Sequence, residues 1–159
     1  MDKYTNYLFA QGPKAMAQIC TWINKKNTCE MPFSADCHNV DSYMKIFNTQ
    51  DFVEADNFFT TEAINVWECG PGYDMTMDNF YCKLTIHNQH DDELKSCETQ
   101  VLDNFNHDFN CKYANQYVSC VTNVYQKYCG IAAAKFGCNW AEVAMKVDVP
   151  QCNNTLPVC

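Results

Sequence analysis

Arginine is absent from this chain of 159 residues, so its positive charge comes from 11 lysines alone. The 19 acidic side chains outnumber the lysines, and the formal net charge is -8 at neutral pH. A nucleic-acid-binding surface needs clustered positive charge to replace the counterions of the phosphates. The composition therefore argues against nucleic acid as a partner.

Long apolar runs are absent as well. The longest uncharged stretches are interrupted by Asn, Gln, Thr and Ser side chains, whereas a membrane-spanning helix needs about 20 consecutive apolar residues. We therefore predict that the chain has no membrane span. The alternating pattern that marks β-hairpins is also missing, which favours a helical fold.

What the sequence does contain is cysteine, with 12 residues spread along nearly the whole chain. None of them form a Cys-x-x-Cys pair, the spacing that lets one loop wrap a zinc ion, so zinc clustering is not favoured. Their even number predicts about six disulfides, which persist only in oxidising compartments. We therefore expect a secreted, extracellular protein, although the sequence leaves the pairing open. The predicted disulfide cysteines are Cys20, Cys29, Cys37, Cys69, Cys82, Cys97, Cys111, Cys120, Cys129, Cys138, Cys152 and Cys159.

Features near both ends of the sequence bear on secretion. Met1-Asp2-Lys3 leads directly into polar sequence rather than into the apolar segment of a signal peptide. We therefore expect a mature chain from which the leader has been removed. Asn153-Asn154-Thr155 is a glycosylation sequon in a tail flanked by proline, which predicts a glycoprotein with Asn153 as the acceptor.

The spacing of apolar residues is helical almost throughout the chain. It predicts one all-α, cysteine-rich domain over residues 1–159, a disulfide-stapled bundle of five or six helices. Residues 1–12 are expected to be a leading segment, 27–39 a loop tied by Cys29 and Cys37, and 147–159 a disulfide-tied tail. The expected helices cover residues 13–26, 51–68, 77–87, 91–105, 108–129 and 131–146, with 41–47 as a further short candidate.

The clearest helical signal lies between Asp108 and Cys129. Cys111, Cys120 and Cys129 are spaced nine residues apart there, and nine residues turn a helix by about 900°, or half a revolution net. Cys111 and Cys129 therefore share one flank, and Cys120 lies on the other. We predict that disulfides link this helix to two different neighbours.

Tyrosines follow the apolar face of the same helix, at Tyr113, Tyr117, Tyr125 and Tyr128. Stripes at helical spacing usually face the core, so core filling is the favoured interpretation. The alternative is a protein interface or an amphiphilic ligand pocket, which tyrosine also suits. Tyr113 lies beside the centre of the stripe and is expected to be the exposed member.

The cysteine run of the C-terminal half has a further pattern. Eight residues separate Cys111 from Cys120 and Cys120 from Cys129. The run is preceded by Cys97, Phe105 and Phe109 and is followed by Gly130-Ile131-Ala132-Ala133. Over about residues 69–138 this resembles a nematode-expanded family of secreted cysteine-rich domains, known as domain of unknown function nineteen and also found in chondroitin-proteoglycan-type proteins. The resemblance implies an extracellular, helical, disulfide-bonded fold with no assigned catalytic residues. Cys138 and Cys159 depart from the usual pattern.

His107-Asp108 is the first candidate for catalysis. Followed by Cys111, the pair is similar to that of secreted calcium-dependent phospholipases, in which the His is a general base and the Asp holds calcium. Trp67–Gly72 is slightly similar to the calcium loop of those enzymes. The cysteine here follows the aspartate by three residues rather than two, so this hypothesis is not favoured. The alternative is a helix N-terminus with an exposed His107 and with Asp108 favoured by the helix dipole.

A second candidate is a metal site formed by His87 and His90 with Asp91, Asp92 and Glu93, because such side chains ligate zinc. No second ligand cluster can be placed beside it, so a solvated connection whose Asp91 or Asp92 caps the next helix is favoured. His38 stands alone. No metal and no cofactor are therefore predicted.

A disulfide framework without an intact catalytic constellation decides the functional prediction. We expect a secreted, non-enzymatic module that binds an extracellular protein or matrix partner. One alternative is a carrier of a small apolar ligand or lipid, held between the aromatic helices. The less favoured alternative is the calcium-dependent, phospholipase-like hydrolase.

Overall fold

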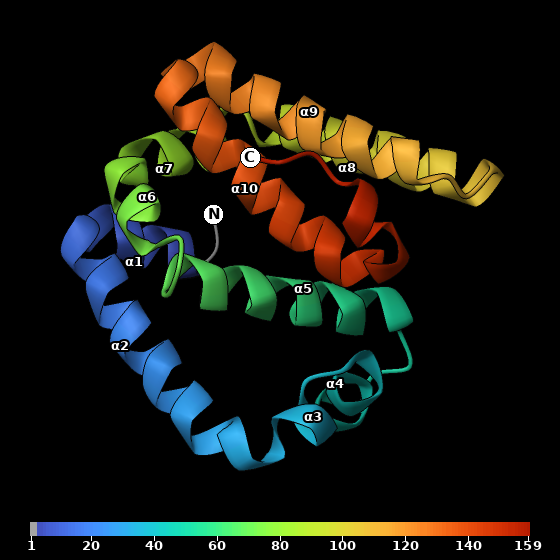
Figure 1. Cartoon of the computed structure of the whole chain (residues 1–159). Helices are drawn as coiled ribbons and strands as arrows, with labels where there is room; N and C mark the ends of the chain where they lie inside the picture. Colours follow the sequence, from blue (N-terminus) through green and yellow to red (C-terminus); the bar gives the residue numbers. More distant parts are fainter. Residues whose placement is uncertain (1–2) are drawn as a thin grey trace.

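The computed structural model describes residues 3–159, except for the side chains of residues 3–5 and 33–35, and this part of the chain is all-α (Figure 1). The α-helices number ten in it rather than the predicted five or six. In chain order the helices are α1 (Lys3–Gln11), α2 (Pro13–Glu30), the 3₁₀-helix η1 (Met31–Phe33), α3 (Ser34–Cys37), α4 (Val40–Phe47), α5 (Phe52–Glu68), α6 (Tyr73–Asp78), α7 (Phe80–Gln89), α8 (Asp91–His107), α9 (Cys111–Cys129), α10 (Ile131–Asp148) and the 3₁₀-helix η2 (Pro150–Thr155).

The additional helices are short ones that the apolar spacing does not reveal. The leading segment contains α1, and the expected loop at 27–39 is replaced by the end of α2, η1 and α3. The helix expected at 77–87 is two helices, because Asn79 leaves the helical conformation and its side-chain amide donates to the Met75 carbonyl 2.8 Å away. Helices this short depend on tertiary packing rather than on their own periodicity.

Side chains at the predicted starts of the longer helices act as caps. Asp51 accepts hydrogen bonds from the backbone N–H groups of Val53 and Glu54 at the start of α5. Asn110 accepts one from Lys112 at the start of α9. Each cap satisfies backbone donors that have no partner within the first helical turn. The predicted boundaries of these helices therefore agree with the structure to within a few residues.

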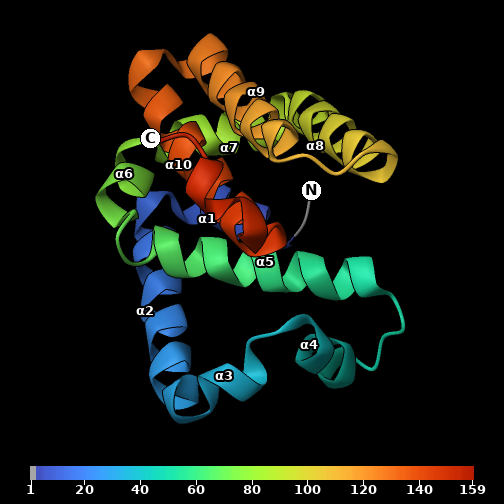
Figure 2. The same cartoon turned by 45° about the vertical axis from the view of Figure 1, so that its right-hand side comes forward.

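The buried residues form two clusters. The larger one lies between α7, α8, α9, α10 and η2, and the smaller one joins α1 and α2 to Cys69 and α7. Figures 1 and 2 show α5 between α10 on one side and α4 on the other, with α2, α3 and α4 forming an arm that extends from the rest of the molecule. The α4 helix and the first turns of α5 therefore lie outside both buried clusters, whereas Trp67 near the end of α5 packs against the larger one.

Close contact between α9 and α10 depends on two glycines. Gly130 has φ +85° and joins the two helices, in a conformation that residues with a side chain rarely adopt. Gly137 lies against the ring of Tyr125, so that a Cβ at this position would be 2.6 Å from the nearest ring atom. The absence of a side chain at Gly137 lets the two helices approach.

Five disulfides are present, of which three join two helices and the other two join a helix to Cys69 after α5 or to Cys159 after η2. They are Cys20–Cys69, Cys82–Cys129, Cys97–Cys120, Cys111–Cys152 and Cys138–Cys159. Three of them link α9 to other elements, one to α7, one to α8 and one to η2. This helix therefore has three disulfide-linked neighbours rather than the predicted two.

The predicted sixth disulfide is not formed, because Cys29 and Cys37 are both free thiols. The prediction placed both cysteines in one loop that they tie, but α2 continues past Cys29 to Glu30 and Cys37 ends α3. Cys29 is exposed and Cys37 is half-buried.

Candidate functional site

The phospholipase-like residues are not brought together. His107 is the last residue of α8 and Asp108 follows it, so the pair lies at a helix C-terminus rather than at the expected N-terminus. Both side chains are exposed. The junction of α8 and α9 and the connection from α5 to α6, which contains Gly70 and Gly72, lie at opposite ends of the molecule in Figures 1 and 2. The structure therefore does not bring His107 and Asp108 next to the segment that was compared with a calcium loop.

The segment from His87 to Glu93 holds α8 against α9. The ring of His90 is stacked on that of Tyr128, with ring centroids 3.5 Å apart. Glu93 accepts hydrogen bonds from the Tyr128 hydroxyl and from Lys127 Nζ, the latter at 2.9 Å. These two hydrogen bonds lower the pKa of the Glu93 carboxyl.

The residues of this segment that were considered as helix caps or metal ligands make other contacts. The α8 helix begins at Asp91 without a side-chain cap, and Asp91 instead pairs with Lys95 at 2.6 Å. Within residues 3–159 no group of three or more His, Cys, Asp or Glu side chains is placed to hold a metal ion. His38 pairs with Glu30, 3.0 Å away.

The tyrosines of α9 mainly fill the core, as the favoured interpretation predicts. Tyr117 and Tyr125 are buried, and burial raises the pKa of both phenols. The Tyr125 hydroxyl has no hydrogen-bond partner among the described residues. Tyr113 was expected to be exposed but is half-buried, because its ring packs edge-on against Phe105.

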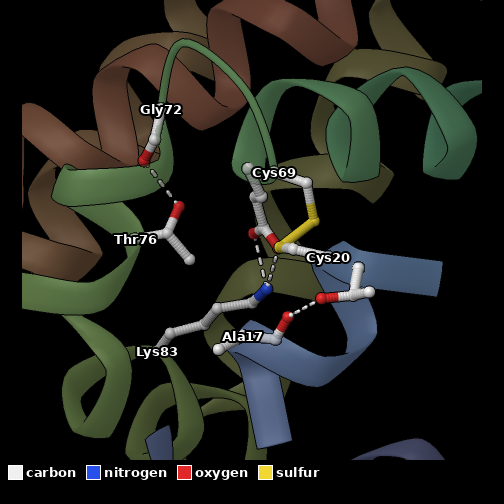
Figure 3. Close-up of a disulfide and its surroundings, with 8 residues drawn as sticks. Ala17, Cys20, Cys69, Gly72, Thr76 and Lys83 are labelled. Atoms are coloured by element: carbon white, nitrogen blue, oxygen red, sulfur yellow. Dashed lines mark hydrogen bonds and ion pairs between the residues drawn. A yellow bond between two sulfur atoms is a disulfide. The ribbon is translucent and has the colours of Figure 1, made fainter. Parts of the chain in front are cut away.

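A polar pair lies buried next to the Cys20–Cys69 disulfide (Figure 3). Glu68 ends α5 and is 0% exposed, and Lys83 of α7 places its Nζ 2.5 and 2.6 Å from the two carboxylate oxygens. A buried carboxylate needs a partner of this kind, because its charge is otherwise poorly solvated. The disulfide and the ion pair together fix α2, α5 and α7 to one another.

The turn beside this pair is equally constrained. A Cβ at Gly72 would lie 2.5 Å from the ring of Trp67, so only glycine fits there. The buried Thr76 hydroxyl donates to the Gly72 carbonyl oxygen at 2.9 Å, as Figure 3 shows. The segment that was compared with a calcium loop is therefore a packed turn.

The α4–α5 hairpin carries an exposed apolar surface that the sequence did not predict. The apolar stripe expected on α5 consists of Phe52, Ala55, Phe59, Ala63, Val66 and Trp67, and two of its members, Phe52 and Val66, are exposed. Of the others, Ala55 is buried and Phe59, Ala63 and Trp67 are half-buried, while the helix also buries Ile64 and Glu68. Phe58 lies outside that stripe and was the available signal, because neighbours on a helix point about 100° apart and a large aromatic residue beside the predicted stripe is a candidate for the surface.

Three exposed apolar side chains of this hairpin are connected, and we call them the hairpin patch: Phe47, Val53 and Phe58, which are 46%, 63% and 41% exposed. Phe47 of α4 is stacked on Phe58 of α5, with ring centroids 4.3 Å apart. Val53 and Phe58 line a shallow groove of about 310 Å³ along α5. Its other lining residues are Asp51, Glu54, Asn57 and Thr61.

Acidic residues outnumber basic ones in the segment that forms the hairpin patch. Residues 40–61 contain four carboxylates and one lysine. Two of the carboxylates, Asp51 and Glu54, line the groove itself. The surface therefore combines exposed aromatic area with an acidic border.

The predicted glycosylation site is accessible, because Asn153 is exposed in η2. Whether it carries a glycan stays a prediction. Among the helices of residues 3–159, none has the length and the apolar character needed to cross a bilayer. The five disulfides fit an extracellular protein.

Comparison with protein-family models, with curated proteins and with solved structures found no match. The resemblance to the nematode cysteine-rich family therefore stays a prediction from the sequence.

Proposed function

We propose that this chain is a secreted, non-enzymatic module that binds an extracellular protein or matrix component through its α4–α5 hairpin. Five disulfides support the compartment, because such bonds persist where the surroundings are oxidising. Four of them join cysteines between Cys82 and Cys159, and the fifth joins α2 to the residue after α5. This framework supplies a rigid base from which the hairpin extends.

The exposed hairpin patch is the observation that carries the proposal. Phe47 and Phe58 are stacked on each other but leave much of their ring surface open to solvent. Aromatic side chains are enriched in the cores of protein interfaces, where they supply a large share of the binding energy. An aromatic pair in such a position is therefore typical of a contact surface.

The alternative of an apolar-ligand carrier has less support. Carriers enclose their ligand in a mostly apolar cavity. A groove of about 470 Å³ between α8 and α9 is lined by Gln100, Asn115, Gln116, Ser119, Cys120 and Asn123, and most of these side chains are polar. Such a lining does not favour a lipid.

Site-specific photo-crosslinking tests the proposed function. A benzophenone amino acid would replace Phe52, which is exposed next to the hairpin patch, and in a matched control it would replace the exposed Leu102 of α8. In extracellular fluid from the source organism, we expect defined adducts from the hairpin position and few from the control. Equal labelling from both positions would contradict the proposal.

A further inference from the structure

We infer that the partner of the α4–α5 hairpin presents a cationic amphipathic helix to the groove along α5, an assignment that rests on the proposed function above. The apolar face of that helix covers Phe47 and Phe58. Its lysine or arginine side chains pair with Asp51 and Glu54. The inference follows from the shape, the composition and the charge of the groove.

The groove is a shallow depression on one face of α5, because all of its lining residues belong to this helix or to its N-cap Asp51. Val53, Asn57 and Thr61 lie along it at intervals of four residues, so it follows the axis of α5. With a rise of 1.5 Å per residue, these positions span about 12 Å, or roughly two turns of a docked helix. An amphipathic helix binds such a groove through apolar side chains spaced three or four residues apart.

The apolar contacts come from the stacked pair. Phe58 lines the groove, and Phe47 of α4 extends the same surface through its ring contact at 4.3 Å. Because the two rings support each other, little side-chain freedom is left to lose on binding, which favours association.

The acidic side chains are held in place at the same groove. The hydrogen bonds that Asp51 accepts from Val53 and Glu54 both end on Oδ1. The bond that Glu54 accepts from the Thr49 hydroxyl, at 2.8 Å, ends on Oε2. The second oxygen of each carboxylate can therefore accept a hydrogen bond from an ammonium or guanidinium group, in a charge-assisted contact.

Charge also argues against two other occupants. A second copy of the chain would bring four more hairpin carboxylates, with a single lysine, against the first set, and each copy has a net charge of -8. An anionic lipid surface would be repelled in the same way. Complementarity of charge therefore favours a basic partner.

Fluorescence anisotropy with defined peptides tests the inference on the full chain. The probe is a labelled amphipathic peptide of leucine and lysine, about 14 residues or four turns long. Its comparison is the same pattern with glutamate in place of lysine. We expect the lysine peptide to bind and the glutamate peptide not to bind. Raising the salt concentration from about 50 to 500 mM should weaken binding by roughly tenfold, because salt screens exposed charge pairs.

Two hairpin variants separate the apolar and the charged contributions. Phe47→Ser with Phe58→Ser should weaken binding by about tenfold or more, the usual effect of removing an interface anchor. Asp51→Asn with Glu54→Gln keeps a cap at α5 and should remove most of the salt dependence. The matched control, Leu102→Ser with Asp103→Asn, changes an exposed apolar residue and a neighbouring exposed carboxylate of α8 and should bind like the unaltered chain.

Several outcomes would overturn the inference. One is equal binding of the lysine peptide and the glutamate peptide. Another is a loss of peptide binding in the α8 control as large as the loss in the hairpin variants. A third is self-association of the chain that the Phe47 and Phe58 substitutions abolish. If the lysine peptide does not bind while the benzophenone at Phe52 still forms defined adducts, the cationic helix is wrong and the proposed function stands. If neither experiment gives a positive result, both are wrong.

Discussion

Lys83 and Glu68 form an ion pair with Nζ to oxygen distances of 2.5 and 2.6 Å, at a carboxylate that has no exposed surface. They are 15 residues apart in the sequence and belong to α7 and α5. Removing one partner of a buried pair leaves an uncompensated charge in the interior, which costs more than the pair itself contributes.

We therefore expect Lys83→Met to lower the free energy of unfolding by about 3 kcal/mol at neutral pH. Replacing both partners, Lys83→Met with Glu68→Gln, should recover part of the loss, because no buried charge remains. Urea unfolding measures both values. Lys146→Met is the control, since its ammonium pairs with Glu142 at the surface, and it should cost under about 1 kcal/mol. Equal losses in the two single variants would contradict the prediction.

The carboxyl of Asp148 predicts a pH-dependent stability. Burial between α10 and α5 raises its pKa to about 6. The hydrogen bond from the Thr60 hydroxyl opposes this shift, and the carboxylates of Asp56 and Glu98 add to it. The folded chain therefore binds more protons than the unfolded chain between the ordinary value of 3.8 and about 6.

Stability from this group is present below about pH 4 and is lost as the pH rises through about 6. Asp148→Asn should remove that slope and raise the free energy of unfolding at pH 7 by about 2 kcal/mol. Chemical unfolding at pH 4, 5, 6 and 7 checks the difference between the two chains. Asp103→Asn on α8, an exposed position, should leave the profile unchanged, and a constant difference across all four pH values would rule out the assignment.

The free thiols predict a specific labelling pattern. Iodoacetamide added to the native, unreduced chain should modify Cys29 quickly and Cys37 more slowly, because the first is exposed and the second half-buried. Peptide mapping should find the other ten cysteines in five linked pairs. A linked Cys29–Cys37 peptide in the native protein would show that α2 and α3 rearrange at this point.

At Gly137 we expect a substitution by alanine to lower the stability of the fold, which is the opposite of what helix propensity alone predicts. Alanine is ordinarily better than glycine inside a helix by about 1 kcal/mol. Here the added methyl group would lie 2.6 to 2.9 Å from three atoms of Tyr125, so Gly137→Ala should destabilise the fold by about 1 to 3 kcal/mol. Thermal unfolding measures it, with Ala132→Gly at an exposed position of α10 as the propensity control. A stabilised Gly137→Ala variant would mean that α9 and α10 pack less closely.

Helices α9 and α5 differ in how well the spacing of apolar residues predicts which side chains are buried. In α9 the predicted stripe of Ala114, Tyr117, Val118 and Val121 is buried, because neighbouring elements cover one side of the helix. In α5 the same rule predicts a stripe of six residues, of which Ala55, Phe59, Ala63 and Trp67 are buried or half-buried, whereas Phe52 and Val66 are exposed. Packing with α4, α10 and α2 covers most of the predicted side of this helix but leaves these two residues in solvent, and the spacing alone does not show how far the cover extends.

Local properties of the chain were enough to determine the all-α class, the positions of the long helices and the richness in disulfides. These follow from neighbouring residues, whose backbone hydrogen bonds and side-chain spacing act over a few positions. Tertiary structure alone decided which cysteines pair, that Cys29 and Cys37 stay apart, that Glu68 is buried with Lys83, and that Phe47 meets Phe58 at the surface. Each of these depends on distances between segments that are remote in the sequence, and such distances are set only when the helices pack.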